Sequence, residues 1–143
     1  MNDKWGRRIF KAGAVWLLLL GCVHSLSLFV HQVPANNTEK QLLDLMTGYQ
    51  FNIMGSMRSM DNFLRGFSIC FMLAAFGLGG LDLTLAGERA SLLKRVALVN
   101  VVWLAVMTAV SLRYFFAMPT SFLTVALVIF VVACWKLPGQ KAT

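Results

Sequence analysis

Five ionisable residues lie at or near one end of segments that otherwise read as membrane-spanning: His24, Arg58, Asp61, Arg65 and Arg113. A central Arg or Asp in a membrane helix costs roughly 2.5 to 3.5 kcal/mol on insertion scales, so such residues are expected to have a function. Guanidinium groups suit a carboxylate or phosphate, and an imidazole near a carboxylate suits acid-base catalysis close to neutral pH. The residue types therefore indicate a site, and they leave both binding and catalysis open.

The sharpest pattern is a polar stripe at the start of the second apolar run. At about 100° per residue, Arg58, Asp61, Arg65 and Ser68 fall within roughly 80° of one helix face. Asp61 lies three residues after Arg58 and four before Arg65, so it can pair with either. Two arginines against one aspartate leave positive charge to spare, which predicts an anion-binding wall. The alternative is an interfacial row of ion pairs whose arginines reach lipid headgroups.

Two further segments bring polar groups to the same predicted level. His24 lies about six residues, or roughly 9 Å, inside the outer end of the first apolar run, and His31 follows seven residues later. Arg113 and Tyr114 end the third run. A packing role for His24 is the alternative. We expect a ligand-binding site made of His24, Arg58, Asp61, Arg65, Arg113 and Tyr114.

No cofactor or metal is expected. Bis-histidine haem ligation needs imidazoles on opposite sides of the macrocycle, whereas His24 and His31 lie on one predicted helix, so only a dimer could supply that geometry. Two histidines and one nearby aspartate have no recognisable metal-ligand spacing. The three cysteines fall in different apolar runs without a Cys-x-x-Cys pair, so neither a disulfide framework nor thiol redox chemistry is indicated.

Composition places the chain in a membrane. Of its 143 residues, 58% are hydrophobic and only 13% are charged, which is more apolar surface than a soluble domain of this size can bury. The apolar residues predict four spans in one transmembrane domain, at residues 9–31, 62–82, 96–117 and 119–136. The first run stays apolar past Cys22, so we expect an uncleaved span and not a signal peptide. The predicted fold class is all-α, an integral membrane four-helix bundle.

Orientation follows from the basic residues. Of the 13 Lys and Arg, nine lie on the side of the two termini and four on the other side, which places both termini in the cytoplasm. The net charge of +7 is then explained by topology and contact with anionic lipid, so nucleic acid is not expected as a partner.

The outer connection between the first two spans predicts a structured segment. Thr38 and Gln41 fit a capping box before an apolar stretch, so we expect a short amphipathic helix at about Thr38 to Thr47 in the outer interface. On the inner side, Asp82 stands close to several loop charges, and we expect it to belong to a solvated loop.

The segment Gly55-Ser56-Met57-Arg58-Ser59, followed by Asp61, Phe63 and Gly66-Phe67-Ser68, resembles a pattern in uncharacterised small bacterial four-helix inner-membrane proteins that are broadly DoxX-like in size and shape. The resemblance covers residues 55–68. It implies a multi-pass protein of the bacterial inner (plasma) membrane and carries no activity with it.

Several classes of function fit these observations. We favour binding of an anionic amphiphile, such as a lipid or a quinone-like molecule, or a role as accessory subunit of a membrane complex. The alternatives are a small membrane-embedded enzyme with His24 and Asp61 in acid-base roles, and a dimeric transporter. The transporter is disfavoured because the first predicted span has no membrane carboxylate for proton coupling. Expected partners are membrane lipids, a small amphiphilic ligand, and a homo-oligomer or larger membrane complex.

Overall fold

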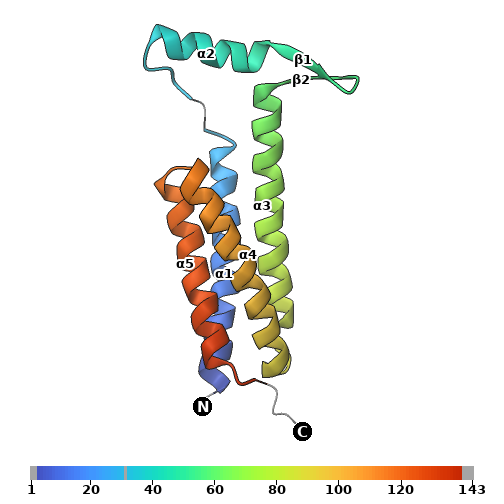
Figure 1. Cartoon of the computed structure of the whole chain (residues 1–143), viewed down its shortest axis with the longest axis vertical. Coiled ribbons are helices and arrows are strands. Elements are labelled where there is room, and N and C mark those ends of the chain that lie inside the picture. The colour runs from blue at the N-terminus through green and yellow to red at the C-terminus, as the bar shows by residue number, and fades with distance from the viewer. Residues whose placement is uncertain (1–2, 31, 140–143) are drawn as a thin grey trace. The chain divides into compact units, whose positions relative to one another are not determined.

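The computed structural model describes residues 3–30 and 32–139. Their elements are α1 (Asp3–Ser27), α2 (Asn37–Gly48), β1 (Gln50–Ile53), β2 (Ser56–Ser59), α3 (Met60–Leu85), α4 (Ala90–Tyr114) and α5 (Ala117–Lys136) (Figure 1). Two compact units share them. We call residues 1–20 with 75–143 the bundle unit and residues 21–74 the hairpin unit. His31 lies outside the described residues.

Four of the helices are long and apolar enough to cross a membrane. α1, α3, α4 and α5 contain 25, 26, 25 and 20 residues. At 1.5 Å per residue they extend for about 30 to 39 Å, against roughly 30 Å of hydrocarbon. Their bounds differ from those of the predicted spans. α1 begins before residue 9 because its Lys and Arg residues are good helix formers, and it ends at Ser27 and not at residue 31.

The core of the bundle unit consists of aliphatic and aromatic side chains, and it lies where the helices approach each other closely. Phe10 and Phe130 are fully buried and meet edge to face, with ring centroids 5.7 Å apart. Gly13 makes room for Phe130, because a Cβ at Gly13 would lie 2.9 Å from that ring. A Cβ at Gly79 would likewise lie 2.9 Å from the Ala14 carbonyl oxygen. Small residues therefore bring α1 close to α3 and α5, as is usual in membrane bundles.

Polar groups also tie the helices of the bundle unit together. The Trp16 indole Nε1 donates to the Phe122 carbonyl at 3.0 Å, and its ring stacks on Phe122 with centroids 5.3 Å apart. The hydroxyls of Ser111 and Thr120 are 2.7 Å apart across the α4–α5 connection. Each of these contacts satisfies a polar group that would be costly to expose to hydrocarbon.

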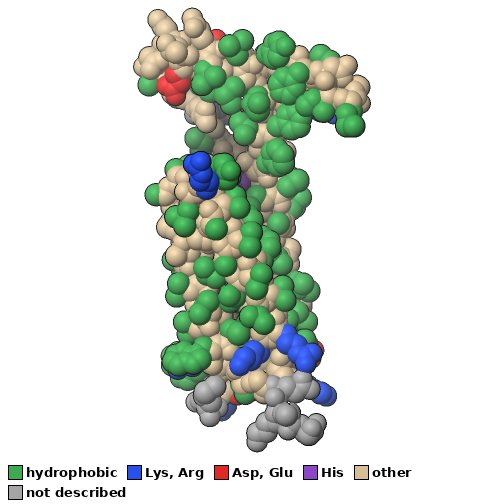
Figure 2. All heavy atoms as spheres, in the orientation of Figure 1, with side chains coloured by type: hydrophobic (Ala, Val, Ile, Leu, Met, Phe, Trp, Pro, Cys, Tyr) green, Lys and Arg blue, Asp and Glu red, His purple; other side chains and the backbone are tan. Residues whose placement is uncertain are grey.

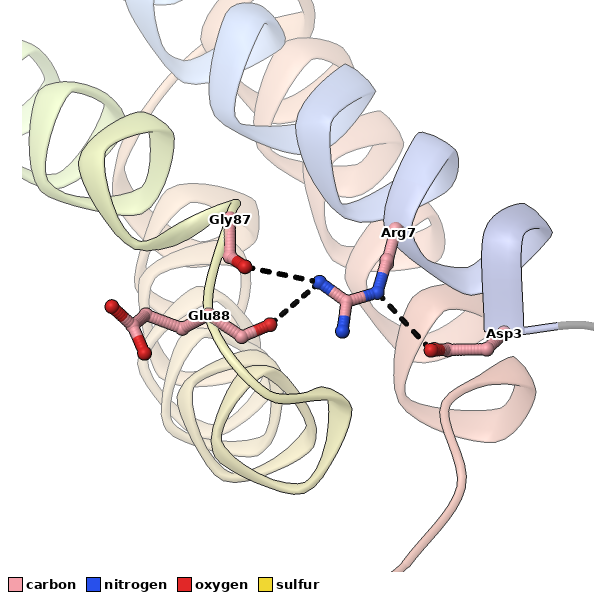
Figure 3. Close-up of polar contacts among 4 residues, drawn as sticks. All are labelled: Asp3, Arg7, Gly87 and Glu88. Atoms are coloured by element: carbon pink, nitrogen blue, oxygen red, sulfur yellow. Dashed lines mark hydrogen bonds and ion pairs between the residues drawn. The ribbon is translucent and has the colours of Figure 1, made fainter.

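Arg7 links the start of α1 to the turn between α3 and α4. Its Nη1 donates to the carbonyls of Glu88, at 2.6 Å, and Gly87, at 3.4 Å (Figure 3). Its Nε pairs with Asp3 Oδ2 at 3.2 Å. Two carbonyls of this turn, which lie outside both helices, thus receive a charged donor.

The flank of the bundle unit is apolar. Figure 2 shows hydrophobic side chains over this flank, with Lys and Arg side chains gathered at the end that carries the α3–α4 turn. Large side chains such as Val99 and Leu112 are 66% and 71% exposed. An apolar surface of this extent is typical of a protein that faces lipid.

In the hairpin unit, α2 starts earlier than predicted. Its cap is Asn36, whose Oδ1 accepts from the Glu39 amide at 2.9 Å, while Glu39 Oε2 accepts from the Ala35 amide at 2.6 Å. The prediction of Thr38 as the cap is therefore wrong. Both spacings fit a capping box, and Asn36 together with the charged Glu39 satisfies two amides here.

Candidate functional site

A β-hairpin that the sequence did not predict leads directly into α3. β1 and β2 pair antiparallel, with Phe51 opposite Arg58 and Ile53 opposite Ser56. The two residues between them, Met54 and Gly55, have φ of 50° and 87°. Positive φ at both central residues is the geometry of a type I′ hairpin turn. The usual sequence signal is Asn-Gly or Asp-Gly, and Met-Gly does not carry it.

The joint between the hairpin and α3 is a reciprocal cap. The Ser59 amide donates to Asn62 Oδ1 at 3.1 Å, and the Asn62 amide donates to Ser59 Oγ at 3.3 Å. Ser59 is only 3% exposed. The cap fixes the first turn of α3 and therefore the direction in which β2 enters it.

The predicted helical stripe is wrong for Arg58. This residue lies in β2, because α3 begins only at Met60. Its Nη1 donates to the neighbouring Met57 carbonyl at 2.8 Å. Within residues 3–30 and 32–139 it forms no ion pair, so its charge is not neutralised by a carboxylate of the described chain.

Asp61 pairs with Arg65 and not with Arg58. Arg65 Nε lies 2.8 Å from Asp61 Oδ2 at i,i+4 spacing on α3. The Arg65 side chain is 61% exposed and that of Asp61 33%, so the pair contributes on the order of 0.5 kcal/mol or less. Asp61 therefore neutralises one of the two arginines, and the charge that remains is that of Arg58.

Arg58 stands at the edge of a shallow groove on the hairpin unit. The groove has a volume of about 530 Å³ and is lined by Arg58, Asn62, Phe63, Gly66, Phe67 and Cys70. The last five recur at helical spacing and form one face of α3. A Cβ at Gly66 would meet nothing within 4 Å, so the space beside this glycine is open. A guanidinium thus adjoins an apolar wall.

His24 is not among the residues that line the groove. Its ring meets Phe71 at a centroid distance of 4.8 Å and an interplanar angle of 67°, and its Nε2 is shielded from solvent. At about 100° per residue, Phe71 lies roughly 140° around α3 from Gly66 and about 40° from Phe67, beside the face that lines the groove. Among the described residues, no hydrogen bond or ion pair joins His24 to Asp61 or Arg58. The imidazole is packed against an aromatic ring and is not in the groove.

Arg113 and Tyr114 belong to the bundle unit. They end α4, where the Arg113 guanidinium carbon lies 5.7 Å from the centroid of the Tyr114 ring. Tyr114 is 76% exposed. The two side chains contact each other, and the contact is a cation–π interaction worth about 0.5 to 1 kcal/mol at an exposed position.

The sequence analysis missed a buried polar pair in the bundle unit. Asn100 Nδ2 donates to Asp82 Oδ2 at 2.7 Å, and the two residues are 2% and 1% exposed. The prediction that Asp82 belongs to a solvated loop is wrong, because α3 continues to Leu85 and turns Asp82 onto the buried face. The available signal was its spacing from Ala75 and Gly79, which places all three on one helix face.

Known proteins give no template for these sites. Among the described residues, no three His, Cys, Asp or Glu side chains are grouped so that they could hold a metal ion. Comparison of the chain with protein-family models, with curated proteins and with solved structures finds no match.

Proposed function

We propose that this multi-pass protein binds an anionic amphiphile, a lipid or a quinone-like molecule, in the groove on α3. The headgroup contacts Arg58 and the tail lies along Phe63, Gly66 and Phe67. The observation that carries the proposal is the groove itself, which combines an unneutralised guanidinium with an apolar helix face.

The chemistry of Arg58 favours an anion. A guanidinium presents five donors in a planar fork that matches carboxylate and phosphate oxygens, and only one donor contact of Arg58 is made to the described chain. Arg65 is less suited because its Nε already binds Asp61. Arg58 is therefore the anion ligand in this proposal.

The wall of the groove favours an elongated apolar tail. Phe63, Phe67 and Cys70 follow one another down α3, and Phe67 is 72% exposed. A small water-soluble anion would leave this wall uncovered, whereas an acyl or isoprenoid chain would bury it. The tail then runs parallel to α3, as a lipid chain does beside a membrane helix.

The membrane context is part of the proposal. Both termini lie in the cytoplasm of a bacterial cell, α3 enters the inner membrane at Met60 from the outer side, and α2 lies along the outer surface. The support is the excess of Lys and Arg on the side of the termini. The resemblance of residues 55–68 to DoxX-like proteins agrees with this placement.

An enzyme that uses His24 and Asp61 is less well supported. Acid-base catalysis needs both groups within reach of one substrate. His24 contacts Phe71, and Asp61 is engaged by Arg65. A role as accessory subunit remains the second proposal, because a helix of a partner protein could cover the same open face beside Gly66.

Native mass spectrometry of the protein in mild detergent tests the proposal. Wild type is compared with Arg58→Gln, which removes the charge, and with Gly66→Leu, which fills the groove. The matched controls are Arg65→Gln and Gly80→Leu, because Arg65 is paired and a Cβ at Gly80 also meets nothing within 4 Å.

We expect a bound lipid or quinone-like adduct on wild type and both controls, and its loss from both groove variants. Either leucine replaces a helical glycine and should not weaken the fold. A bare chain in every sample, or the same adduct on all five proteins, would refute the groove as the binding site and favour the accessory subunit.

A further inference from the structure

The hairpin is fixed firmly to the start of α3. The reciprocal Ser59–Asn62 cap joins β2 to the helix with no intervening linker. On the other strand, Phe51 stacks on Phe63 of α3 with centroids 6.0 Å apart and an interplanar angle of 12°. Figure 1 shows the hairpin lying across the N-terminal end of α3. The hairpin must therefore sit at the depth at which α3 begins.

The two faces of the hairpin differ in polarity along β1. Because side chains alternate along a strand, Phe51 and Ile53 share one face of β1, and Gln50 and Asn52 share the other. Residues paired across the strands lie on the same face, so β2 adds Arg58 and Ser56 to the face of Phe51 and adds Met57 and Ser59 to the other. The stack of Phe51 on Phe63 turns the apolar face toward the body of α3. In a protein whose α3 crosses the membrane, this is the face directed at the bilayer, and the polar face is directed at water.

The tip of the hairpin is apolar where a polar turn residue is the norm. Met54 is the one non-glycine residue with positive φ in the described chain, and its side chain is fully exposed, at 102%. Left-handed backbone is unfavourable for a residue with a long side chain, and Asn or Gly would adopt it more easily. Met54 therefore has a strained backbone conformation, and nothing in the described chain covers its thioether side chain.

We propose that the hairpin is a membrane-surface anchor, with Ile53 and Met54 inserted into the acyl boundary of the outer leaflet. We infer that the bilayer covers this apolar face, because the face is continuous, through the Phe51–Phe63 stack, with the lipid-facing surface of α3. Arg58 is the only charged residue from Leu45 to Met60, and it suits lipid phosphates at that depth. The anchor requires that α3 spans the membrane, and it does not require a ligand in the groove.

Spin labels in vesicles of phosphatidylethanolamine and phosphatidylglycerol test the anchor. Single cysteines replace Met54 or Ile53 in a background with Cys22, Cys70 and Cys134 changed to Ala. Matched controls carry the label at Gln50, on the polar face of the same strand, and at Leu73, an exposed residue further down α3. The readout is collision with oxygen, which concentrates in lipid, relative to a water-soluble nickel chelate.

We expect the Met54 and Ile53 labels to show an oxygen-to-nickel ratio severalfold above that of the Gln50 label and closer to that of the Leu73 label. Equal ratios at Met54 and Gln50, with Leu73 in lipid, would overturn the anchor. Shielding of Met54 from both reagents would overturn it as well, because a protein surface would then cover the tip. A Leu73 label in water would instead refute the span on which the anchor depends.

Discussion

The Asp82–Asn100 pair makes a quantitative prediction for the variant Asn100→Ala. The substitution removes the amide that donates to Asp82 Oδ2 at 2.7 Å and leaves a carboxyl group at a position that is 1% exposed. A hydrogen bond to a charged group contributes about 1.5 to 3 kcal/mol in soluble proteins. Polar pairs between membrane helices average about 0.6 and reach about 1.7 kcal/mol. We therefore expect a loss of about 2 kcal/mol, because this pair is almost completely buried.

The measurement is thermal unfolding in detergent followed by tryptophan fluorescence, for which the stacked Trp16 is a reporter. At about 2 to 4 °C per kcal/mol for a chain of this size, Asn100→Ala should lower Tm by roughly 4 to 8 °C. The control is Thr84→Ala on α3, which removes an exposed hydroxyl bonded to its own helix and should change stability by about 0.5 kcal/mol or less.

A double-mutant cycle with Asp82→Ala separates the pair from the packing around each residue. Removal of both partners leaves no orphaned carboxyl or amide, so the double variant should lose less stability than the sum of the single variants, by about 1 kcal/mol or more. Strict additivity, or an Asn100→Ala variant that melts with wild type, would refute the reasoning.

Three further substitutions have expected outcomes. Gly13→Ala should lower the free energy of unfolding by about 1 kcal/mol, because overpacking against the Phe130 ring, 2.9 Å from the new Cβ, outweighs the gain in helix propensity. Gly77→Ala should raise the free energy of unfolding, because its new Cβ has no atom within 4 Å. Chemical denaturation measures both variants. Met54→Asn should stabilise the hairpin by about 1 kcal/mol, because Asn tolerates the left-handed backbone of the turn. The measurement is the exchange of the hairpin's amide hydrogens, which should slow. Unchanged exchange would show that Met54 is not strained. Arg7→Gln removes the charged donor to the Glu88 carbonyl and should speed cleavage of the α3–α4 turn by a Glu-specific protease. Equal cleavage rates for wild type and variant would show that Arg7 does not hold this turn in place.

The sequence predicted the long helices well and the local joints poorly. Four runs of apolar residues give a strong signal for helices of membrane length, and the structure has a long apolar helix at each. The hairpin was missed because its turn is Met-Gly, and β-strands of four residues have little periodicity to detect. That turn removed Arg58 from the helical stripe to which its spacing assigned it.

Contacts between elements could not be read from spacing alone. Asp61 had two possible partners at helical spacing. Because the cap at Ser59 starts α3 after Arg58, only Arg65 lies on the same helix as Asp61 and pairs with it. Asp82 was grouped with loop charges that are its neighbours in sequence, although its partner Asn100 lies 18 residues away on the next helix. The groove and the stack of His24 on Phe71 depend on tertiary packing, for which one sequence carries no direct signal.

The Asp82–Asn100 hydrogen bond also bears on how the chain is built into a membrane. Each polar side chain, inserted alone, opposes partitioning of its helix, by roughly 2.5 to 3.5 kcal/mol for Asp at mid-bilayer and less near an end. Only residues 86–89 separate α3 from α4, so the second helix can follow the first almost at once. If α3 and α4 enter the lipid together as a pair, the Asn100 amide can bind the Asp82 carboxyl before either group is exposed to hydrocarbon. The two consecutive helices would then insert as a single unit.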